Sequence, residues 1–482
     1  MKETFMCCIK TPLCLCFTFI VALMFLDGCT VGPDYVRPVA TPVMPTSYKE
    51  VNGWKTAQPM DSVVKGTWWR IFDDPQLNAL EEQVVVSNQN ILEAEANFLQ
   101  ARSAIQAARS GYYPSVGAGT SVSRSRQSAD ISASSKTASY YTLPVDTAWE
   151  LDIWGRVRRN VEASRADAQA SEADLAALRL SIQAQLAQTY FELRTLDAQK
   201  ELLDATVSSY QRSLDLTMNR YSSGVVSRSD VLQAETQLKS TMAQTIDLGV
   251  QRARLEHAIA LLIGKPASVF SLSPAPLAVM PPSIPLGVPS ELLERRPDIA
   301  AAERRMAADN ARIGVSEAAW YPSITLSASG GFQATSLSKW LGWPSLFWSM
   351  GPSVSEALFD GGLRKAQTAQ ARAAYDAGVA AYRQIVLTGF QEVEDNLAAL
   401  RIWEEEARVQ DEAVQAARQA VSVAENQYQA GITSYLTVLT AQAAEFGNEK
   451  TAIAIRGNRM TAAVLLVKAL GGGWDSLTLN ED

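Results

Sequence analysis

The chain has 482 residues, of which 47% are hydrophobic and 8% aromatic, and its formal net charge is -8. Such a length can bury a large core, and the heavy use of alanine favours long packed helices over a β-sandwich. The acidic balance and the lack of a basic run argue against nucleic acid as a partner. All five cysteines lie in the first 29 residues, which excludes a structural disulfide or a cysteine-based metal site in the remainder.

The N-terminus has the pattern of a secretory signal. Two lysines precede an apolar run from residue 13 to residue 26, which is too short for a comfortable membrane span. The run ends in Leu-Asp-Gly-Cys at Cys29 and resembles a bacterial lipobox, whose cysteine is lipidated, although Asp27 stands where a small or apolar residue is usual. Thr30 replaces the Asp that typically holds a lipoprotein at the inner membrane, which indicates the outer membrane. An ordinary signal with incidental cysteines is the alternative.

An extended arm is expected next, because residues 31 to about 70 are rich in Pro, Val and Thr and lack a helical period. The first helix then opens at residues 73–75, where an Asp supplies the N-cap and Pro lies in the first turn. It ends at the Tyr-Pro-Ser break of residues 113–115, which recurs 208 residues later at residues 321–323. Proline cannot continue a helix, so a change of structure is expected at both breaks.

Alternating sequence follows both breaks. Residues 145–153 alternate between apolar and mostly acidic side chains, which is the two-residue period of a strand with two unlike faces. Two strands are expected in each copy, at about residues 114–154 and 322–360, with aromatic residues clustered nearby. Four isolated strands among very long helices make a poor soluble sandwich, whereas a membrane barrel with lipid outside and water inside explains the pattern.

Two very long helices come after the strands. Their apolar residues are spaced by threes and fours, and Leu186 and Leu193 of the first copy match Val393 and Leu400 of the second at an offset of 207. Each pattern runs without a proline for about 65 residues, which corresponds to roughly 100 Å of helix. The apolar stripe is interpreted as a coiled-coil core that packs these helices together.

Each long helix ends at the tip of a helical hairpin. Gly431 can adopt the left-handed conformation that closes a helix, and Ser434 can N-cap the helix that follows. Gly224 and Ser227 occupy the same places 207 residues earlier. The chain therefore contains two copies of one unit.

These features, in this order, resemble the TolC-type outer membrane factors, in particular the NodT-like branch of efflux lipoproteins. The resemblance covers nearly the whole mature chain. Besides the two breaks and the two tips, its carriers are Cys29 with Gly32, Pro33, Asp34, Tyr35, Arg37 and Pro38; Trp68, Trp69, Phe72, Asp74 and Pro75; Leu292, Leu293, Arg295, Arg296, Pro297, Asp298 and Ile299; and Ala469, Leu470, Gly471, Gly472, Gly473 and Trp474.

The resemblance implies an α+β membrane protein that forms a homotrimer. Three chains would each give four strands to a twelve-stranded outer-membrane β-barrel, and their helices would continue it as a long periplasmic α-helical barrel. The expected division is a signal peptide at 1–28, a lipidated equatorial arm at 29–72, the first repeat at 73–267 with its tip at about 221–229, a Pro-rich equatorial linker at 268–288, the second repeat at 289–470 with its tip at about 428–436, and a C-terminal equatorial tail at 471–482.

The implied function is a passive outer-membrane channel of a tripartite efflux or export system in a Gram-negative bacterium. Its expected partners are a second and third copy of the chain, outer-membrane lipid, a periplasmic adaptor protein and an inner-membrane pump of the RND type. The residues expected to contact the adaptor lie at the two tips: Gly224, Val225, Ser227, Gly431, Ile432 and Ser434. Cys29 is the expected site of palmitate attachment.

The resemblance also places a gate at the second tip. In this family a Leu ring commonly closes the periplasmic mouth, with an Asp ring one helical turn deeper. Leu436 matches the Leu, but Thr440 stands at the deeper position, so the acidic ring is missing at that level. Asp230, near the first tip, is a candidate substitute charge or an ordinary helix-start residue, and Tyr435 is a further gate candidate.

Two other functions fit the sequence less well than a channel. An envelope fibre explains the helices but not the strands flanked by aromatic residues. A hydrolase is disfavoured because the sequence has no Gly-x-Ser-x-Gly motif. His257 is its single histidine, which leaves too few histidines for most catalytic triads and metal sites. We therefore expect no enzyme activity, no metal and no cofactor, with His257 on a surface or in a groove.

Overall fold

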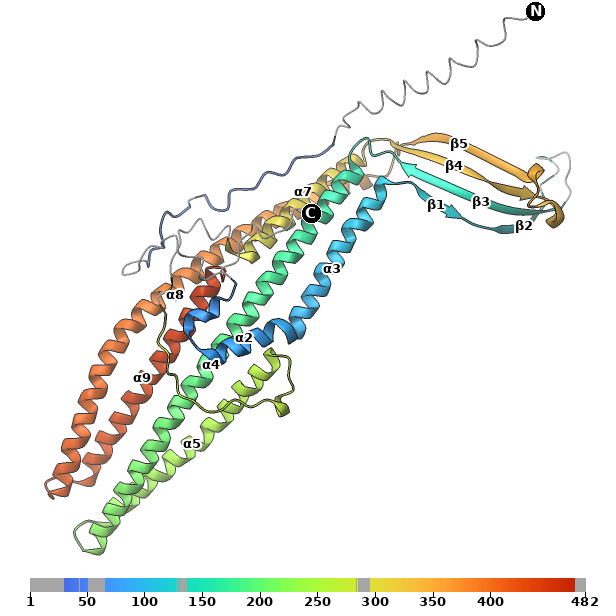
Figure 1. Ribbon diagram of the computed structural model, residues 1–482. Coiled ribbons are helices and arrows are strands. Elements are labelled where there is room, and N and C mark those ends of the chain that lie inside the picture. Colours follow the sequence, from blue (N-terminus) through green and yellow to red (C-terminus); the bar gives the residue numbers. More distant parts are fainter. Residues whose placement is uncertain are drawn as a thin grey trace, which may run out of the picture. The chain divides into compact units, whose positions relative to one another are not determined.

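The computed structural model describes residues 30–42, 44–50, 66–126, 128, 130, 137–282, 284 and 295–472. The chain divides into two compact units (Figure 1). Unit 1 consists of Met1–Pro38, Phe98–Ala170 and Ala302–Tyr382, and unit 2 consists of Val39–Asn97, Ser171–Ala301 and Arg383–Asp482. Cys29, Leu292, Leu293, Gly473 and Trp474, which the sequence singled out, lie outside the described residues.

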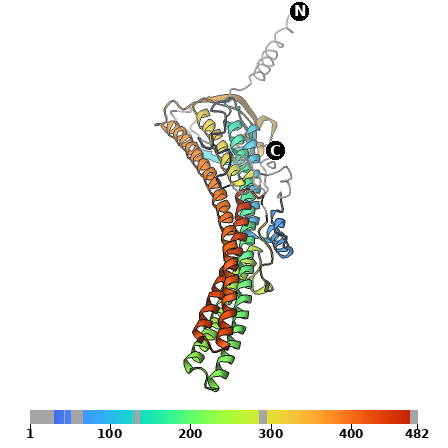
Figure 2. The ribbon, with the colours of Figure 1, turned by 90° about the vertical axis from the view of Figure 1, so that its left-hand side faces the viewer.

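The helices and strands follow the repeat. The principal elements are the 3₁₀ turn η2 (Trp68–Phe72), α2 (Pro75–Ser87), α3 (Gln89–Arg109), β1 (Ser115–Ala118), β2 (Ser121–Ser125), β3 (Ala138–Glu150), α4 (Arg156–Ser222), α5 (Arg228–Leu262), α7 (Pro297–Ala318), β4 (Ser323–Ala334), β5 (Leu346–Ser355), α8 (Leu363–Gln429) and α9 (Tyr435–Ala469). Helices α4 and α8 have 67 residues each, and α5 and α9 have 35 each. The two helical hairpins, α4 with α5 and α8 with α9, are visible in both ribbon views (Figures 1 and 2).

Unit 1 contains one antiparallel sheet in the order β1-β3-β4-β5, and β2 also pairs with β3. Strands β1 and β2 pair with different parts of β3, because Ser115 lies opposite Ala148 and Ser121 lies opposite Thr142. They are therefore two halves of a single strand line that is interrupted at Gly119 and Thr120. The sheet thus has four strand lines, the number expected from the sequence.

The sequence suggested one continuous first helix. The structure instead divides it at Asn88 into α2 and α3. The Asn88 side chain accepts hydrogen bonds from the N–H groups of Asn90 at 3.0 Å and Ile91 at 3.2 Å, and it donates one to the Leu262 carbonyl at 2.7 Å. One amide therefore starts α3 and also satisfies a carbonyl at the end of α5. At the start of α2, Asp74 and not the neighbouring Asp73 is the N-cap.

The core of unit 2 lies where η2 and α2 meet the middle of α4. Trp68, Trp69 and Phe72 are buried, and the Phe72 and Phe191 rings lie 5.1 Å apart. Into this apolar surrounding α2 also places Glu81, which is fully buried and whose carboxyl oxygens have no hydrogen-bond partner among the described residues. Burial raises the pKa of the Glu81 carboxyl well above its usual range.

Candidate channel wall, arm and hairpin tips

The sheet of unit 1 has two unlike faces. Its register brings Trp149 opposite Leu326, and Ala328 opposite Met350, on one face. That face carries Val116, Val145, Trp149, Leu326, Trp348, Met350 and Val354, and all but Trp149 are among the exposed large hydrophobic residues of the chain. The other face carries Ser115, Gly117, Asp146, Ala148, Glu150, Thr325, Ser327, Ser329, Ser349, Gly351 and Ser353. An apolar face opposite a polar one is the arrangement of a barrel wall between lipid and water.

Both edges of the sheet are open within the described residues. The β1/β2 line and β5 each pair along one side only. An unpaired edge in hydrocarbon leaves N–H and C=O groups without partners, at a cost of several kcal/mol per group. Four strand lines are also too few to enclose water, so the sheet requires strands from other copies to close.

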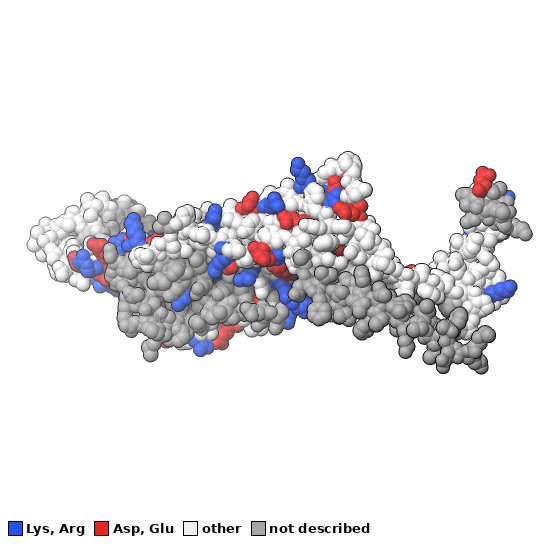
Figure 3. Space-filling model, turned by 90° about the horizontal axis from the view of Figure 1, so that it is seen from above, with Lys and Arg blue, Asp and Glu red and all other residues white. Residues whose placement is uncertain are grey.

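In Figure 3 the visible part of the strand region is almost free of charged atoms, whereas blue and red atoms are interspersed over the helices.

The arm of unit 1 begins beside the segment that joins β3 to α4. The Val31 N–H donates to the Trp154 carbonyl at 3.1 Å, and the Thr30 side chain fills the space beside Gly155, where an added Cβ would lie 2.8 Å from its methyl carbon. Trp154 stacks on Tyr321 with ring centroids 4.8 Å apart. Two aromatic rings therefore lie where a strand gives way to a helix, as in the interfacial girdles of membrane barrels.

Ion pairs with one buried partner each hold the arm on α4 and α7. The almost fully buried Arg159 donates to the carbonyls of Val31 and Gly32 and lies 2.8 Å from Asp34. Farther along, Arg37 pairs with Glu303 at 3.2 Å. Gly32, Asp34 and Arg37 are among the residues on which the resemblance to the TolC-type family rests. These contacts give each of them a structural role in attaching the arm.

The two hairpin tips of unit 2 share one backbone geometry. Gly224 and Gly431 have φ of +73° and +74°. The Val225 N–H donates to the Arg220 carbonyl, and 207 residues later the Ile432 N–H donates to the Gln427 carbonyl. This pattern is the Schellman motif, in which a left-handed glycine ends the helix. The residues after the two glycines, Val225 and Ile432, are 61% and 76% exposed.

The tips differ in how the second helix of each hairpin starts. Ser227 and Asp230 form a capping box, in which each side chain accepts a hydrogen bond from the other's backbone N–H. Ser434 occupies the equivalent N-cap position but makes no side-chain cap bond. Its potential partner is Thr437, 207 residues after Asp230, which bonds to Thr433 instead. A threonine cannot supply the carboxylate that a capping box requires, so the start of α9 is less firmly fixed.

The gate candidates of the second tip lie in different environments. Leu436 is 56% exposed, and Thr440 is exposed with its hydroxyl bonded to the Leu436 carbonyl at 2.8 Å. Tyr435 is buried in an apolar cluster and lies edge-on to Tyr428 at 5.6 Å. Burial, together with the neighbouring tyrosines, raises the pKa of Tyr435 to about 12. Asp230 is already engaged in the capping box described above.

A contact that the sequence did not indicate joins the two tips. Arg220, at the end of α4, donates to the Tyr428 carbonyl at 2.7 Å, and its guanidinium carbon lies 4.6 Å from the centroid of the Tyr428 ring. Arg220 therefore satisfies a carbonyl at the end of α8 and also makes a cation–π contact. Thr217 and Gln442 add contacts between the hairpins, to the Tyr428 hydroxyl and to Ser213.

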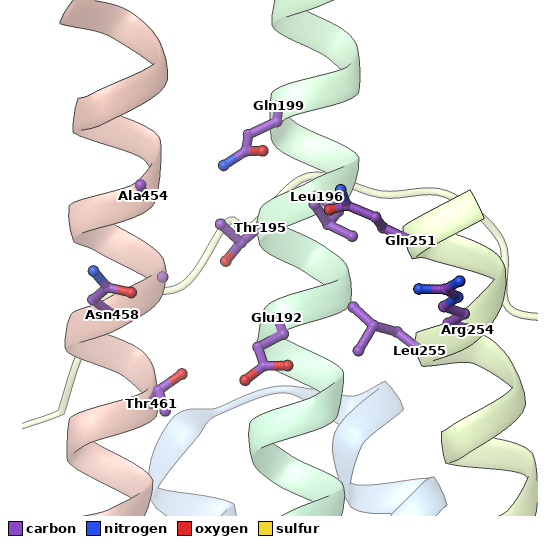
Figure 4. Close-up of a pocket in the computed structure, with 11 residues that line it drawn as sticks. Glu192, Thr195, Leu196, Gln199, Gln251, Arg254, Leu255, Ala454, Asn458 and Thr461 are labelled. Atoms are coloured by element: carbon purple, nitrogen blue, oxygen red, sulfur yellow. The ribbon is translucent and has the colours of Figure 1, made fainter. Parts of the chain in front are cut away.

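A groove of about 450 Å³ with mixed polar and apolar lining lies among α4, α5 and α9. Glu192, Thr195 and Gln199 extend from α4 toward α9 (Figure 4). The two helices approach closely here, because a Cβ added to Gly457 would lie 2.4 Å from the Thr195 hydroxyl oxygen. The lining contains amides, hydroxyls, Glu192 and Arg254 but neither Cys nor His, so it offers no nucleophile paired with an imidazole base. His257 itself is exposed.

The two-faced open sheet, the arm and the paired long hairpins define an outer-membrane channel of the type whose barrel is continued by helices. The chain matches the family model described as outer membrane efflux protein over residues 80–265 and 288–472, one repeat in each segment, and it belongs to that family. The predicted fold class, a trimeric outer-membrane β-barrel continued by a helical barrel, is confirmed. The chain is the outer-membrane channel of a tripartite efflux system and not an enzyme.

Known proteins resemble the chain over nearly its whole length. The solvent efflux pump outer membrane protein SrpC of Pseudomonas putida is 32% identical over 457 residues, which cover 94% of this chain and 97% of the relative. The toluene efflux pump outer membrane protein TtgI, also of Pseudomonas putida, gives the same figures. The solved structure of the outer-membrane channel OprN is 32% identical with a TM-score of 0.86, and the match covers 92% of this chain and 100% of that chain.

Proposed function

We propose that this chain is the lipid-anchored exit duct of an RND-type efflux pump that expels small molecules, and that it meets its adaptor at the hairpin tips. The observation that carries the proposal is the repeated unit itself, a strand pair joined to a long hairpin with an outward apolar residue at its tip. An adaptor needs a site with exposed apolar side chains, and Val225 and Ile432 supply one in the turn of each hairpin. The relatives named for solvent and toluene efflux support small molecules as cargo.

The adaptor contact can be tested by cross-linking in cells. An Ile432→Cys variant, treated with a bifunctional thiol-to-amine reagent, should give an adduct with a periplasmic adaptor whose associated pump is of the RND class. Ile246→Cys on α5 is a matched control, because Ile246 is equally exposed at 76% but is not at a tip. An adduct with the adaptor of another pump class contradicts the RND assignment. Equal adducts from both positions contradict docking at the tips.

The lipid anchor is proposed at Cys29. Its support is the position of the arm, because Thr30 and Val31 contact Gly155 and Trp154 at the strand-to-helix junction. An acyl chain on the preceding residue would start at the level where the barrel leaves the membrane. One acyl chain binds a membrane weakly, and the barrel already holds the trimer there, so the anchor should assist without being essential. Cys29→Ala should abolish incorporation of labelled palmitate, and persistent label would show that the lipobox assignment is wrong.

The gate is proposed at the second tip, with Leu436 as the closing residue. The exposure of Leu436 supports this assignment, because its side chain is free to contact other copies. The neighbouring Tyr435 is buried in the apolar cluster of the tip. Because Thr440 carries no charge, closure depends on apolar contact among three Leu436 side chains, and ion selectivity at that level is weak. The weaker capping at the start of α9 supports the second tip as the one that moves.

A further inference from the structure

The charged residues within the five strands are Arg124, Asp146 and Glu150. Asp146 lies opposite Gly117 and Ser329, so it stands on the polar face of the sheet with Glu150. Arg124 lies opposite Ser139 and therefore stands on the other face. The wall that faces water thus receives its strand charges from two carboxylates of β3.

These two carboxylates differ in their partners. Glu150 accepts two parallel hydrogen bonds from Arg156, at 2.9 Å and 2.6 Å, in the bidentate geometry of a strong ion pair. The Asp146 side chain is exposed, and its carboxylate makes no hydrogen bond or ion pair with any described residue. The charge of Glu150 is neutralised locally, whereas the charge of Asp146 is not.

The small residues around Asp146 leave its carboxylate accessible on the polar face of the sheet. Its neighbours on the polar face are small, and they leave a hollow of about 570 Å³ that Asp146 lines together with Ser115, Gly117, Ala148, Ser327, Ser329, Ser349 and Gly351. Twelve strands spaced about 4.8 Å apart and tilted by about 40° give a backbone radius of roughly 12 Å. Three carboxylates on that wall then lie within roughly a Debye length of the axis at physiological salt, which is about 8 Å.

We propose that Asp146 determines the charge selectivity of the barrel. Three copies form a ring of uncompensated carboxylates that favours cations and cationic cargo and repels anions. The barrel thereby supplies the charge that Thr440 does not supply at the tip. The inference rests on the channel function given above and adds the residue that selects among permeating ions.

The test is the ratio of potassium to chloride permeability of the purified trimer in a planar bilayer. At about 0.1 M salt the ratio should exceed one, and Asp146→Asn should lower it at least about twofold. At about 1 M salt, where the Debye length is about 3 Å, the two proteins should differ little. Asp146→Ser, which repeats the serines of the wall, replaces the Asn variant if that variant does not assemble as a trimer.

Two controls separate Asp146 from a general effect of charge. Arg124→Gln alters the opposite face, and the double variant Glu150→Gln with Arg156→Gln removes a pair that is already neutral. Both should keep the wild-type ratio. A conducting Asp146→Asn or Asp146→Ser trimer with an unchanged ratio overturns the proposal, as does an equal loss in the double variant. A wild-type protein that does not conduct at all would contradict the channel function instead.

Discussion

Removal of Arg220 should loosen the second hairpin tip from the first. The change Arg220→Ala deletes a charged hydrogen bond to the Tyr428 carbonyl, of 2.7 Å, and a cation–π contact at 4.6 Å. Such a bond contributes about 1.5–3 kcal/mol and an exposed cation–π contact about 0.5–1 kcal/mol. Water can replace part of the bond at a helix end, so the net loss is about 2 kcal/mol per protomer. That loss corresponds to roughly a thirtyfold shift toward the undocked tip.

Single-channel recording and antibiotic sensitivity measure this shift. The Arg220→Ala channel should spend more time in a high-conductance state, and cells that carry it should become more sensitive to vancomycin. Arg212→Ala is a matched control, because Arg212 lies on the same helix, is exposed, and has a side chain that makes no hydrogen bond or ion pair with a described residue. Equal behaviour of the two variants and the wild type would refute the role of Arg220 in holding the tip.

Three further predictions concern stability and the gate. The folded state holds a proton on Glu81 that the unfolded chain releases, so stability is lost as pH rises above about 4.3, the unfolded pKa, toward the raised folded pKa. Glu81→Gln removes the titrating group, so it should weaken this pH dependence and raise the melting temperature more at pH 8 than at pH 5; an unchanged pH dependence would contradict the assignment. Thr437→Asp should complete a capping box and stabilise the start of α9 by about 1 kcal/mol, seen as slower amide hydrogen exchange there; unchanged exchange would contradict it. Leu436→Ala should raise conductance and vancomycin sensitivity, and Thr440→Asp should increase cation preference; a Leu436→Ala channel with neither change would place the gate elsewhere.

The repeat, the strands and the long hairpins could be predicted because their signals are local and periodic. Leu186 and Val393 lie in equivalent places on α4 and α8, and both are fully buried. The alternation near Asp146 likewise indicates the two faces of β3 without reference to its partner strands. A period of two or of three to four residues reports which side of an element meets the core, whatever that core contains.

Contacts between distant segments could not be predicted in this way. Asn88 divides the first helix because its amide also reaches the Leu262 carbonyl, a residue 174 positions away. Arg220 reaches across to the other hairpin, 208 residues on in sequence. Tyr435 and Leu436 are adjacent and both apolar in character, yet only the packing at the tip shows that the first is buried and the second exposed.

The central claim is that three copies of this chain close a conducting barrel, and one measurement on purified protein tests it most directly. Native mass measurement in detergent, followed by planar-bilayer recording of the same sample, should give a trimer that conducts ions. The open edges of the sheet require this result, because an isolated monomer would leave unpaired backbone groups in lipid. A monodisperse monomer, or a trimer that never conducts, would contradict the account.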